Sequence, residues 1–285
     1  MAGPARQKAL FYRTLQTIPG VSSMKFLARW RLRKPAEDAE TVYVSERYGV
    51  RSLHIGSDTV QSSMRLKAPN DLELAYTRAM MAFLLFVPPP RNVLMIGLGG
   101  GSLAKFIHYR MPSAQVDAIE VNPQVVAVAR QSFHLPPDGP VFRVRITDGA
   151  EFVRRADVAA DVVMVDGYDA DAYAEELASA AFYQACRARL KEGGVLVVNL
   201  WGGDKEFHSL LQRIERAFPE GTLCLPASRP GNVIVFGFQR NPGAFEWKVL
   251  FQRAAALQSE VGLEFPRFVE GLRTMNRSDA DRLYP

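Results

Sequence analysis

A chain of 285 residues is long enough for one large domain or two small ones, and 48% apolar residues fit a protein with a buried core. No run approaches the roughly 18 consecutive apolar residues of a membrane span. Two distant cysteines and only four histidines argue against a disulfide framework or a zinc site. They favour reduced, buried thiols in a cytoplasmic setting.

The net charge of +5 is unevenly distributed along the chain. Residues 1–34 contain eight Lys or Arg and no acidic residue, whereas the remainder holds 27 basic and 30 acidic residues. We therefore treat residues 1–40 as a basic N-terminal arm, and a solvated or partner-packed arm is preferred over one that binds a polyanion. No apolar run followed by a small-residue cleavage site occurs there, so no secretory signal is expected. Neither a membrane nor a nucleic acid is expected as a partner.

Residues 41–70 have the pattern of a small β-strand unit. Residues 41–45 are rich in β-formers, Tyr48-Gly49 is a turn signal, and residues 50–55 alternate between apolar and polar. The next segment, residues 71–87, predicts a helix capped by Asn70 or Asp71, because apolar residues recur at helical spacing up to the triple proline at 88–90.

From residue 92 onward, predicted strands alternate with predicted helices. Strands are expected at 93–96, 116–119, 141–146, 161–165 and 195–199, with helices at 102–109, 123–132, from 150, 174–190 and 207–218. Two further β-type runs lie near 223 and over 233–238. This alternation predicts an α/β protein with a class I methyltransferase-like Rossmann fold, a doubly wound, mainly parallel seven-stranded sheet over residues 71–244. Residues 245–285 are expected to form a helical tail.

A glycine-rich turn directly follows the first of these strands. It contains Gly97, Gly99 and Gly101, and it opens a helix. Such a turn can bring a ligand against bare backbone and the free N–H groups of a helix start, although tight packing alone also explains glycines there. Glu120 ends the next strand, where a carboxylate can accept both hydroxyls of a ribose; a solvated loop acid is the competing interpretation. No P-loop lysine follows the glycines, which disfavours a nucleoside triphosphate.

Two more acidic motifs end the third and fourth strands. Asp148-Gly149 can reach an adenine amino group, and a simple cap for the following helix is the competing role for Asp148. Asp166 and Asp169 bring two carboxylates beside the same pocket, where a carboxylate can accept a proton from an attacking nitrogen, with helix capping as the alternative for Asp169. Consecutive strand ends that carry Gly, Glu and Asp predict an adenosyl-binding pocket.

These motifs resemble those of the spermidine synthase family, the polyamine aminopropyltransferases. The family reads DVIIVDSSDPxGPAExLFxxxFY where this chain reads DVVMVDGYDADAYAEELASAAFY over residues 161–183, without a gap. Residues 193–197 resemble the family's GGxLV strand, Gln61 falls on the N-terminal hairpin unit, and Tyr76 on the tyrosine of the YHE motif. The resemblance covers about residues 42–240.

The resemblance implies transfer of an aminopropyl group from decarboxylated S-adenosylmethionine to an amine, with methylthioadenosine as the leaving group. By this likeness Asp166 is the proton acceptor and Asp169 helps to hold the acceptor amine. Gln61, Gly97, Gly99, Gly101, Glu120, Asp148 and Gly149 hold the adenosyl part, and Tyr76 walls the acceptor site. No bound metal or covalently bound cofactor is implied, and the family commonly dimerises.

The chain departs from the family in the amine half of the site. The family's GGGDGG loop has an Asp where this chain has Gly100, the His and Glu of YHE are Thr77 and Arg78, and the YPSG segment corresponds to residues 228–231, with a cation at Arg229. A cation in the acceptor channel would repel a polyamine by more than about 1 kcal/mol if poorly solvated. Methyl transfer from S-adenosylmethionine, and a non-catalytic nucleoside-binding or scaffold protein, therefore remain as alternatives.

Overall fold

The computed structural model describes residues 41–155, 157, 159–167, 175–227 and 231–285. The basic arm therefore lies outside the described residues, as do Tyr168, Asp169 and Arg229. Among the described residues, no helix combines the length and apolar character that crossing a bilayer requires. Cys186 and Cys224 are both buried and unpaired, as the sequence predicts.

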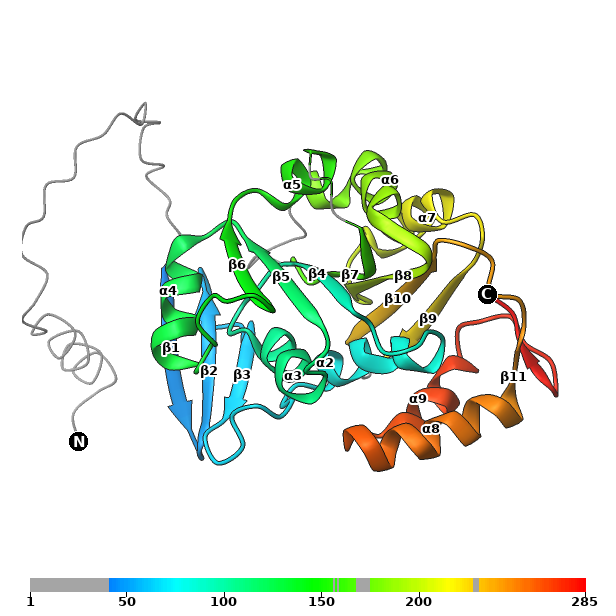
Figure 1. The fold of residues 1–285 in the computed structure, drawn as a ribbon, viewed down its shortest axis with the longest axis horizontal. Helices are drawn as coiled ribbons and strands as arrows, with labels where there is room; N and C mark the ends of the chain where they lie inside the picture. Colours follow the sequence, from blue (N-terminus) through cyan, green and yellow to red (C-terminus); the bar gives the residue numbers. More distant parts are fainter. Residues whose placement is uncertain (1–40, 156, 158, 168–174, 228–230) are drawn as a thin grey trace, which may run out of the picture. The chain divides into compact units, whose positions relative to one another are not determined.

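A seven-stranded sheet forms the centre of the described chain (Figure 1), in the order β6-β5-β4-β7-β8-β10-β9. Six strands run parallel, and β10 alone runs antiparallel to both of its neighbours, β8 and β9. The strands are β4 (Asn92–Ile96), β5 (Gln115–Glu120), β6 (Phe142–Ile146), β7 (Ala160–Val165), β8 (Leu190–Trp201), β9 (Thr222–Pro226) and β10 (Asn232–Phe238). The predicted mainly parallel, seven-stranded Rossmann sheet is confirmed.

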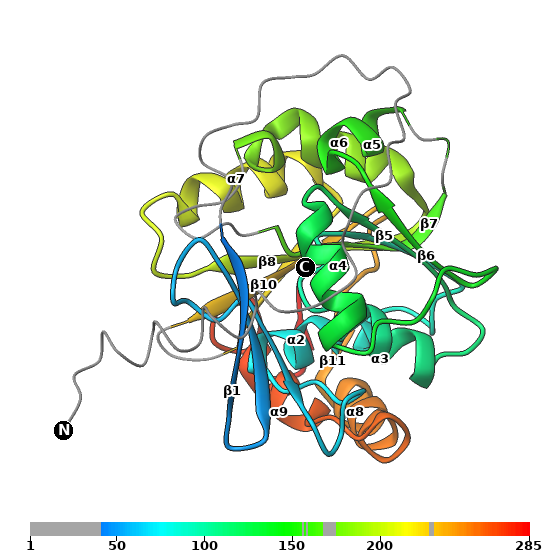
Figure 2. The same cartoon turned by 90° about the vertical axis from the view of Figure 1, so that its left-hand side faces the viewer.

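Helices cover both faces of this sheet, as Figures 1 and 2 show. One face packs against α5 (Gly149–Arg155), α6 (Ala180–Arg189) and α7 (Phe207–Ala217). The other packs against α3 (Ser102–Arg110), α4 (Pro123–Ser132) and the C-terminal helices α8 (Trp247–Val261) and α9 (Phe265–Leu272). Two short strands, β11 (Phe245–Glu246) and β12 (Arg282–Leu283), pair and bring the end of the tail back to the start of α8.

Residues 71–87 differ from the single predicted helix. The helix α2 spans only Ala75–Met80 and continues as the 3-10 helix η1 (Met81–Leu85), with extended Leu74 as a cap that makes no side-chain hydrogen bond. The predicted caps at Asn70 and Asp71 are therefore wrong. Every residue from Ala79 to Val87 is buried, so burial on all sides, and not one apolar face, accounts for the hydrophobicity of this segment.

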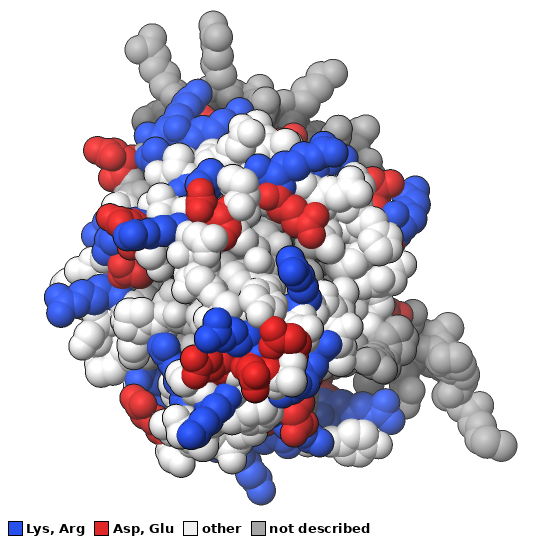
Figure 3. Space-filling view, turned by 90° about the vertical axis from the view of Figure 1, so that its right-hand side faces the viewer, with Lys and Arg blue, Asp and Glu red and all other residues white. Residues whose placement is uncertain are grey.

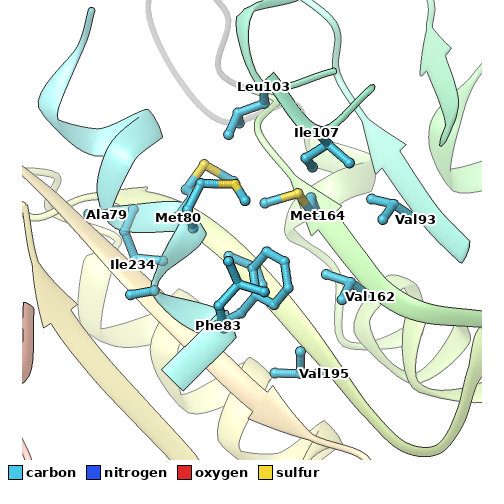
Figure 4. Packing of buried hydrophobic residues seen from close by; sticks show 14 of the residues in the cluster. Ala79, Met80, Phe83, Val93, Leu103, Ile107, Val162, Met164, Val195 and Ile234 are labelled. Atoms are coloured by element: carbon cyan, nitrogen blue, oxygen red, sulfur yellow. The ribbon is translucent and has the colours of Figure 1, made fainter. Parts of the chain in front are cut away.

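Phe83 of η1 sits against the middle of the sheet (Figure 4). Around it lie Val162 and Met164 of β7, Val195 of β8 and Ile234 of β10. Because side chains alternate along a strand, these apolar rows continue on the same face into Asp166, Asn199 and Asn232 at the carboxyl edge of the parallel strands. The core therefore holds the backbone from which the polar site residues project.

The N-terminal β unit contains three antiparallel strands, β1 (Val42–Arg47), β2 (Val50–Ile55) and β3 (Ser62–Arg65). Tyr48 and Gly49 both have positive φ, at 54° and 74°, as a two-residue hairpin turn requires. Leu53 and Met64 of the unit pack against Val125 and Phe133 at helix α4. This contact places β3 beside the glycine-rich turn, where Ser62 Oγ lies 3.3 Å from Ser102 Oγ.

On the side of the molecule that Figure 3 shows, acidic and basic side chains of the described residues are intermingled. This agrees with the nearly balanced charge of the sequence beyond residue 34.

Candidate active site

A cavity of about 620 Å³ opens where the parallel strands end. Eight of the residues that the sequence singles out line it: Gln61, Tyr76, Gly97, Gly99, Glu120, Asp148, Gly149 and Asp166. They lie at or just after the ends of β4, β5, β6 and β7, at the start of α5, in α2, and in the segment that leads into β3. Residues separated by about a hundred positions in the chain therefore meet at one edge of the sheet, which is the usual ligand position in open α/β folds.

The glycines of the turn after β4 have distinct structural reasons. Gly97, Gly99 and Gly101 have φ of 92°, 53° and 73°, a region that side chains other than glycine rarely adopt. Gly101, however, does not line the cavity: it is the N-cap of α3, and a Cβ there would lie 2.3 Å from Leu135 Cδ1. The structure thus gives Gly101 a packing role and leaves Gly97 and Gly99 beside the cavity.

Glu120 is held in place by backbone amides. Its Oε2 accepts from the N–H of Leu98 at 3.0 Å, and its Oε1 accepts from the N–H of Asn122 at 2.9 Å. Burial raises the pKa of this carboxyl, and these backbone donors oppose that rise. The carboxylate is therefore fixed between the glycine-rich turn and the start of α4.

Asp148 caps helix α5, the alternative role that the sequence allows. Its Oδ1 accepts from the N–H of Glu151 at 2.6 Å, in the first turn of α5. The residue also lines the cavity, so capping and ligand binding are compatible, since one carboxylate oxygen suffices for the cap. Gly149 is packed so closely that a Cβ there would lie 2.5 Å from Ile96 Cγ2.

Asp166 is the centre of a polar network. Its Oδ1 accepts from Asn199 Nδ2 at 2.8 Å, and Asn199 Oδ1 accepts from Asn232 Nδ2 at 2.9 Å. The single hydroxyl hydrogen of Tyr76 is shared between two acceptors, the Asp166 carboxylate and the Gln61 carbonyl oxygen, which lies 3.2 Å away. Burial raises the pKa of Asp166 against the opposing effect of Asn199 and Tyr76, while burial and the nearby Asp166 charge raise the pKa of Tyr76.

Arg78 lies outside the cavity. Its Nε bonds to Glu264 Oε1 at 2.8 Å, and its guanidinium donates to the carbonyl oxygens of Leu72 and Glu73. The concern that Arg78 would repel an amine in the acceptor channel is therefore wrong, because this cation is paired elsewhere. The corresponding expectations for Asp169 and Arg229 lie outside the described residues.

The sequence interpretation missed several residues of the cavity wall. Asn199, Asn232, Ser62, Glu176, Trp201 and Asp204 all line it. The available signal for Asn199 was its position as a polar residue after an apolar run. That pattern does not identify a site residue, because a polar residue also marks the ordinary end of a buried strand. The described lining residues include five carboxylates, from Glu120, Asp148, Asp166, Glu176 and Asp204, and no Lys, Arg or His.

Position 100 has no room for an acid. A Cβ there would lie 2.9 Å from both Phe133 Cδ1 and Ser62 Oγ. The β unit and the end of α4 thus occupy the space that a side chain at this position would need.

Among the described residues, no cluster of His, Cys, Asp or Glu is arranged to hold a metal ion.

The fold and the position of the site define a Rossmann-like α/β protein, and solved structures of a spermidine synthase and of a methyltransferase share this architecture. A probable spermidine synthase from Corynebacterium glutamicum superposes with a TM-score of 0.65 at 18% identity, covering 85% of this chain and 94% of its own. Human methyltransferase-like protein 13, solved in complex with SAH, superposes with a TM-score of 0.60 at 25% identity, covering 72% of this chain and 96% of its own.

The family follows from the sequence comparisons. The family model described as the Spermine/spermidine synthase domain matches residues 73–240. A polyamine aminopropyltransferase of Chromobacterium violaceum is 42% identical over 255 residues, which cover 90% of this chain and 98% of that protein. The chain belongs to the spermine/spermidine synthase family.

Proposed function

We propose that this chain transfers the aminopropyl group of decarboxylated S-adenosylmethionine to an amine acceptor and releases methylthioadenosine. The observation that carries the proposal is the charge of the cavity wall, with five carboxylates and no cation among its described residues. Such a cleft favours ligands that carry sulfonium and ammonium groups. It offers no cationic partner to the additional carboxylate of ordinary S-adenosylmethionine.

In this proposal the adenosyl half is bound at the ends of β4, β5 and β6. Glu120, already oriented by backbone donors that include Leu98 and Asn122, accepts from the ribose hydroxyls. The second oxygen of Asp148 accepts from the adenine amino group. Gly97, Gly99 and Gly149 allow close approach of the ligand to the backbone, and Gln61 contributes its side chain from the β unit.

The reacting half lies at Asp166. The lone pair of the acceptor nitrogen attacks the methylene carbon beside the sulfonium, and the carbon–sulfur bond breaks with its electron pair going to sulfur. The new ammonium then gives one proton to Asp166, whose raised pKa suits a proton acceptor better than an ordinary surface carboxylate would. Tyr76 walls the acceptor channel, and Asp169 holds the acceptor amine. Much of the acceleration comes from aligning nitrogen, carbon and sulfur.

The decisive experiment compares the two sulfonium compounds. Purified protein is titrated calorimetrically with decarboxylated and with ordinary S-adenosylmethionine, then incubated with mixed amines while the nucleoside product is identified by chromatography. We expect tighter binding of the decarboxylated compound and release of methylthioadenosine. Preference for the carboxylated compound with S-adenosylhomocysteine as product would contradict the proposal, and no binding of either would point to a non-catalytic scaffold.

Methyl transfer is the second candidate function, and one observation favours it. The acid that the family resemblance predicts at position 100 is replaced by Gly100, and Phe133 and Ser62 occupy its space. An acid there would repel the carboxylate of ordinary S-adenosylmethionine, so its loss removes one barrier to that compound. The same product analysis separates the two functions.

We also propose a homodimer, on the strength of the family resemblance, and a cytoplasmic setting, which the scarcity of cysteine supports. Sedimentation of the full chain at several concentrations tests the oligomeric state.

A further inference from the structure

Three polar side chains form a line across neighbouring strands on one face of the sheet. Asn232 of β10 donates to Asn199 of β8, and Asn199 donates to Asp166 at the end of β7, with donor–acceptor distances of 2.9 and 2.8 Å. On the same face of the sheet, Asp166 and Asn199 lie two positions after Met164 and Val197, which belong to the apolar core. We propose that Asn199 and Asn232 are positioning residues that hold the Asp166 carboxylate as an oriented hydrogen-bond acceptor. This inference rests on the proposed function of Asp166.

The burial of Asn199 needs a reason beyond folding. Its residue surface is only 3% exposed, and its neighbours along the strand are valines and leucines. The backbone of β8 already pairs with β7 and β10 on both sides, so the strand does not need the side-chain amide. Burying an amide costs free energy unless it is hydrogen-bonded, and both ends of this amide are satisfied, one by Asp166 and one by Asn232.

The ionisation of Asp166 decides which group of each asparagine donates and which accepts. An ionised carboxylate can only accept, so Asn199 must present its NH₂ group to Asp166 and its oxygen to Asn232. Asn232 must then present its own NH₂ group to Asn199. A protonated Asp166 would gain a donor and would no longer require this orientation. The two amides, fixed in series, therefore favour the anionic form that a proton acceptor needs before the reaction.

Of the other described groups near Asp166, Tyr76 shares this effect, and the acidic residues of the cavity do not. Tyr76 of α2 is the described titratable side chain that bonds to Asp166, and Glu120, Asp148, Glu176 and Asp204 share the cavity. All four of the latter are acidic, and the described cavity wall has no cation. Burial makes ionisation of Asp166 harder, so the neutral donors Asn199 and Tyr76 carry the stabilisation of its charge. The direction of the pKa effect of Asn199, which is downward, agrees with this geometry.

The test follows the ionisation of Asp166 in substrate-free protein by infrared spectroscopy as a function of pH. The carboxyl band that disappears in Asp166→Asn identifies the residue. In Asn199→Leu we expect the midpoint of this band to move upward by about one pH unit, because a donor to the anion is lost. Asn232→Leu, which leaves the Asn199–Asp166 pair in place, should move it by less in the same direction. The matched control is Asn92→Leu at the opposite end of the sheet, where the amide bonds to Gln115 and Lys191.

The outcomes separate the two proposals. Unchanged midpoints in the folded Asn199 and Asn232 variants would overturn the positioning role, even if Asp166→Asn is inactive. If Asn199→Leu does not fold, the test rests on the pH midpoint of Asp166 in Asn232→Leu. An upward shift supports the positioning role, because a merely structural role of Asn232 would not move the titration of Asp166. Retained turnover in Asp166→Asn would instead overturn the proposed proton acceptor, whatever the midpoints show.

Discussion

The backbone oxygen of Asp166 lies directly against Gly97, so that a Cβ on Gly97 would stand only 2.1 Å from it. The two residues follow neighbouring strands that end in register, with Ile96 beside Val165. The obstacle is main chain and not the end of a flexible side chain, and it cannot give way without separating β4 from β7. The first glycine of the turn is thus required by the sheet as well as by any ligand.

We therefore expect Gly97→Ala to lower the free energy of unfolding by about 3 kcal/mol or more, through both the clash and the positive φ. Urea unfolding followed by circular dichroism measures this. Gly243→Ala is the matched control, because Gly243 also has a positive φ, at 75°, but has open space around it. That variant should lose only about 1 kcal/mol. Equal losses at the two positions would show that the contact with Asp166 does not matter.

Asp166→Asn should reduce turnover by about 10²- to 10⁴-fold while leaving the affinity for decarboxylated S-adenosylmethionine within about threefold, because an amide cannot accept the proton. Steady-state kinetics and calorimetric titration of the same preparation measure both quantities. Asp204→Asn, which also removes a carboxylate from the cavity wall, controls for the loss of charge alone. Turnover at the level of the unmodified protein would remove Asp166 from the mechanism.

Glu120→Gln should show the opposite division of effects. One of its backbone donors, such as Leu98 or Asn122, would face an NH₂ group in place of an acceptor, and the ribose would lose a charged partner. We expect the dissociation constant of the sulfonium compound to rise by about 10- to 100-fold, with a smaller change in kcat. Asp117 lies on the same strand and pairs with Arg145 outside the cavity. Asp117→Asn should therefore change neither the dissociation constant nor kcat. A dissociation constant that does not change in Glu120→Gln would exclude Glu120 from binding.

The sequence predicted the sheet because buried parallel strands are short apolar runs bounded by turn signals, as at 93–96 and 161–165. It also predicted which strand ends would carry the cavity, because parallel strands of one sheet end on the same side. Asn199 and Asn232 could not be predicted as partners: they are 33 residues apart, and only the antiparallel placement of β10 brings them together. Similarly, no local signal separates Gly101, which packs on Leu135, from Gly97 and Gly99, which face the cavity.

The start of α2 also depends on tertiary contacts. Apolar spacing extends the predicted helix back to residue 71, but Arg78 folds back onto the carbonyl oxygens of Leu72 and Glu73 and pairs with Glu264 from the tail. Those carbonyls are therefore satisfied without a helical turn, and the chain remains extended at Leu74. A contact that spans 186 residues of sequence cannot be read from local periodicity.

Lys105 predicts a specific pH dependence of stability. This lysine is fully buried, its Nζ donates to the carbonyl oxygens of Pro69 and Phe133, and burial lowers its pKa from 10.5 to about 8. Between these two values the unfolded chain holds a proton that the folded chain has released, so this residue makes the free energy of unfolding rise with pH, by up to about 3 kcal/mol. The neutral amine keeps two N–H donors for its two carbonyl partners.

The measurement compares urea unfolding of the unmodified protein and Lys105→Met at pH 8 and pH 10, since other groups also titrate in this range. The difference in stability between the two proteins should shift in favour of the unmodified protein as the pH rises. Lys191→Met, whose ammonium pairs with Asp161 at the other end of the sheet, should not reproduce that trend. A difference that is independent of pH would mean that Lys105 keeps its proton throughout.

Arg78 should matter for stability and not for the acceptor amine. It joins α2 to the C-terminal tail through Glu264, and both side chains of the pair are partly buried. We expect Arg78→Ala to cost about 1–2 kcal/mol of unfolding free energy, because two backbone carbonyls and a carboxylate lose a charged donor. Arg110→Ala, which breaks a more exposed pair with Asp71, should cost less than about 0.5 kcal/mol.

The KM for the acceptor should stay within twofold in both variants, since neither arginine lines the cavity. A marked fall in that KM in Arg78→Ala alone would show that the cation does repel the acceptor, and it would place Arg78 in the channel in the enzyme–substrate complex.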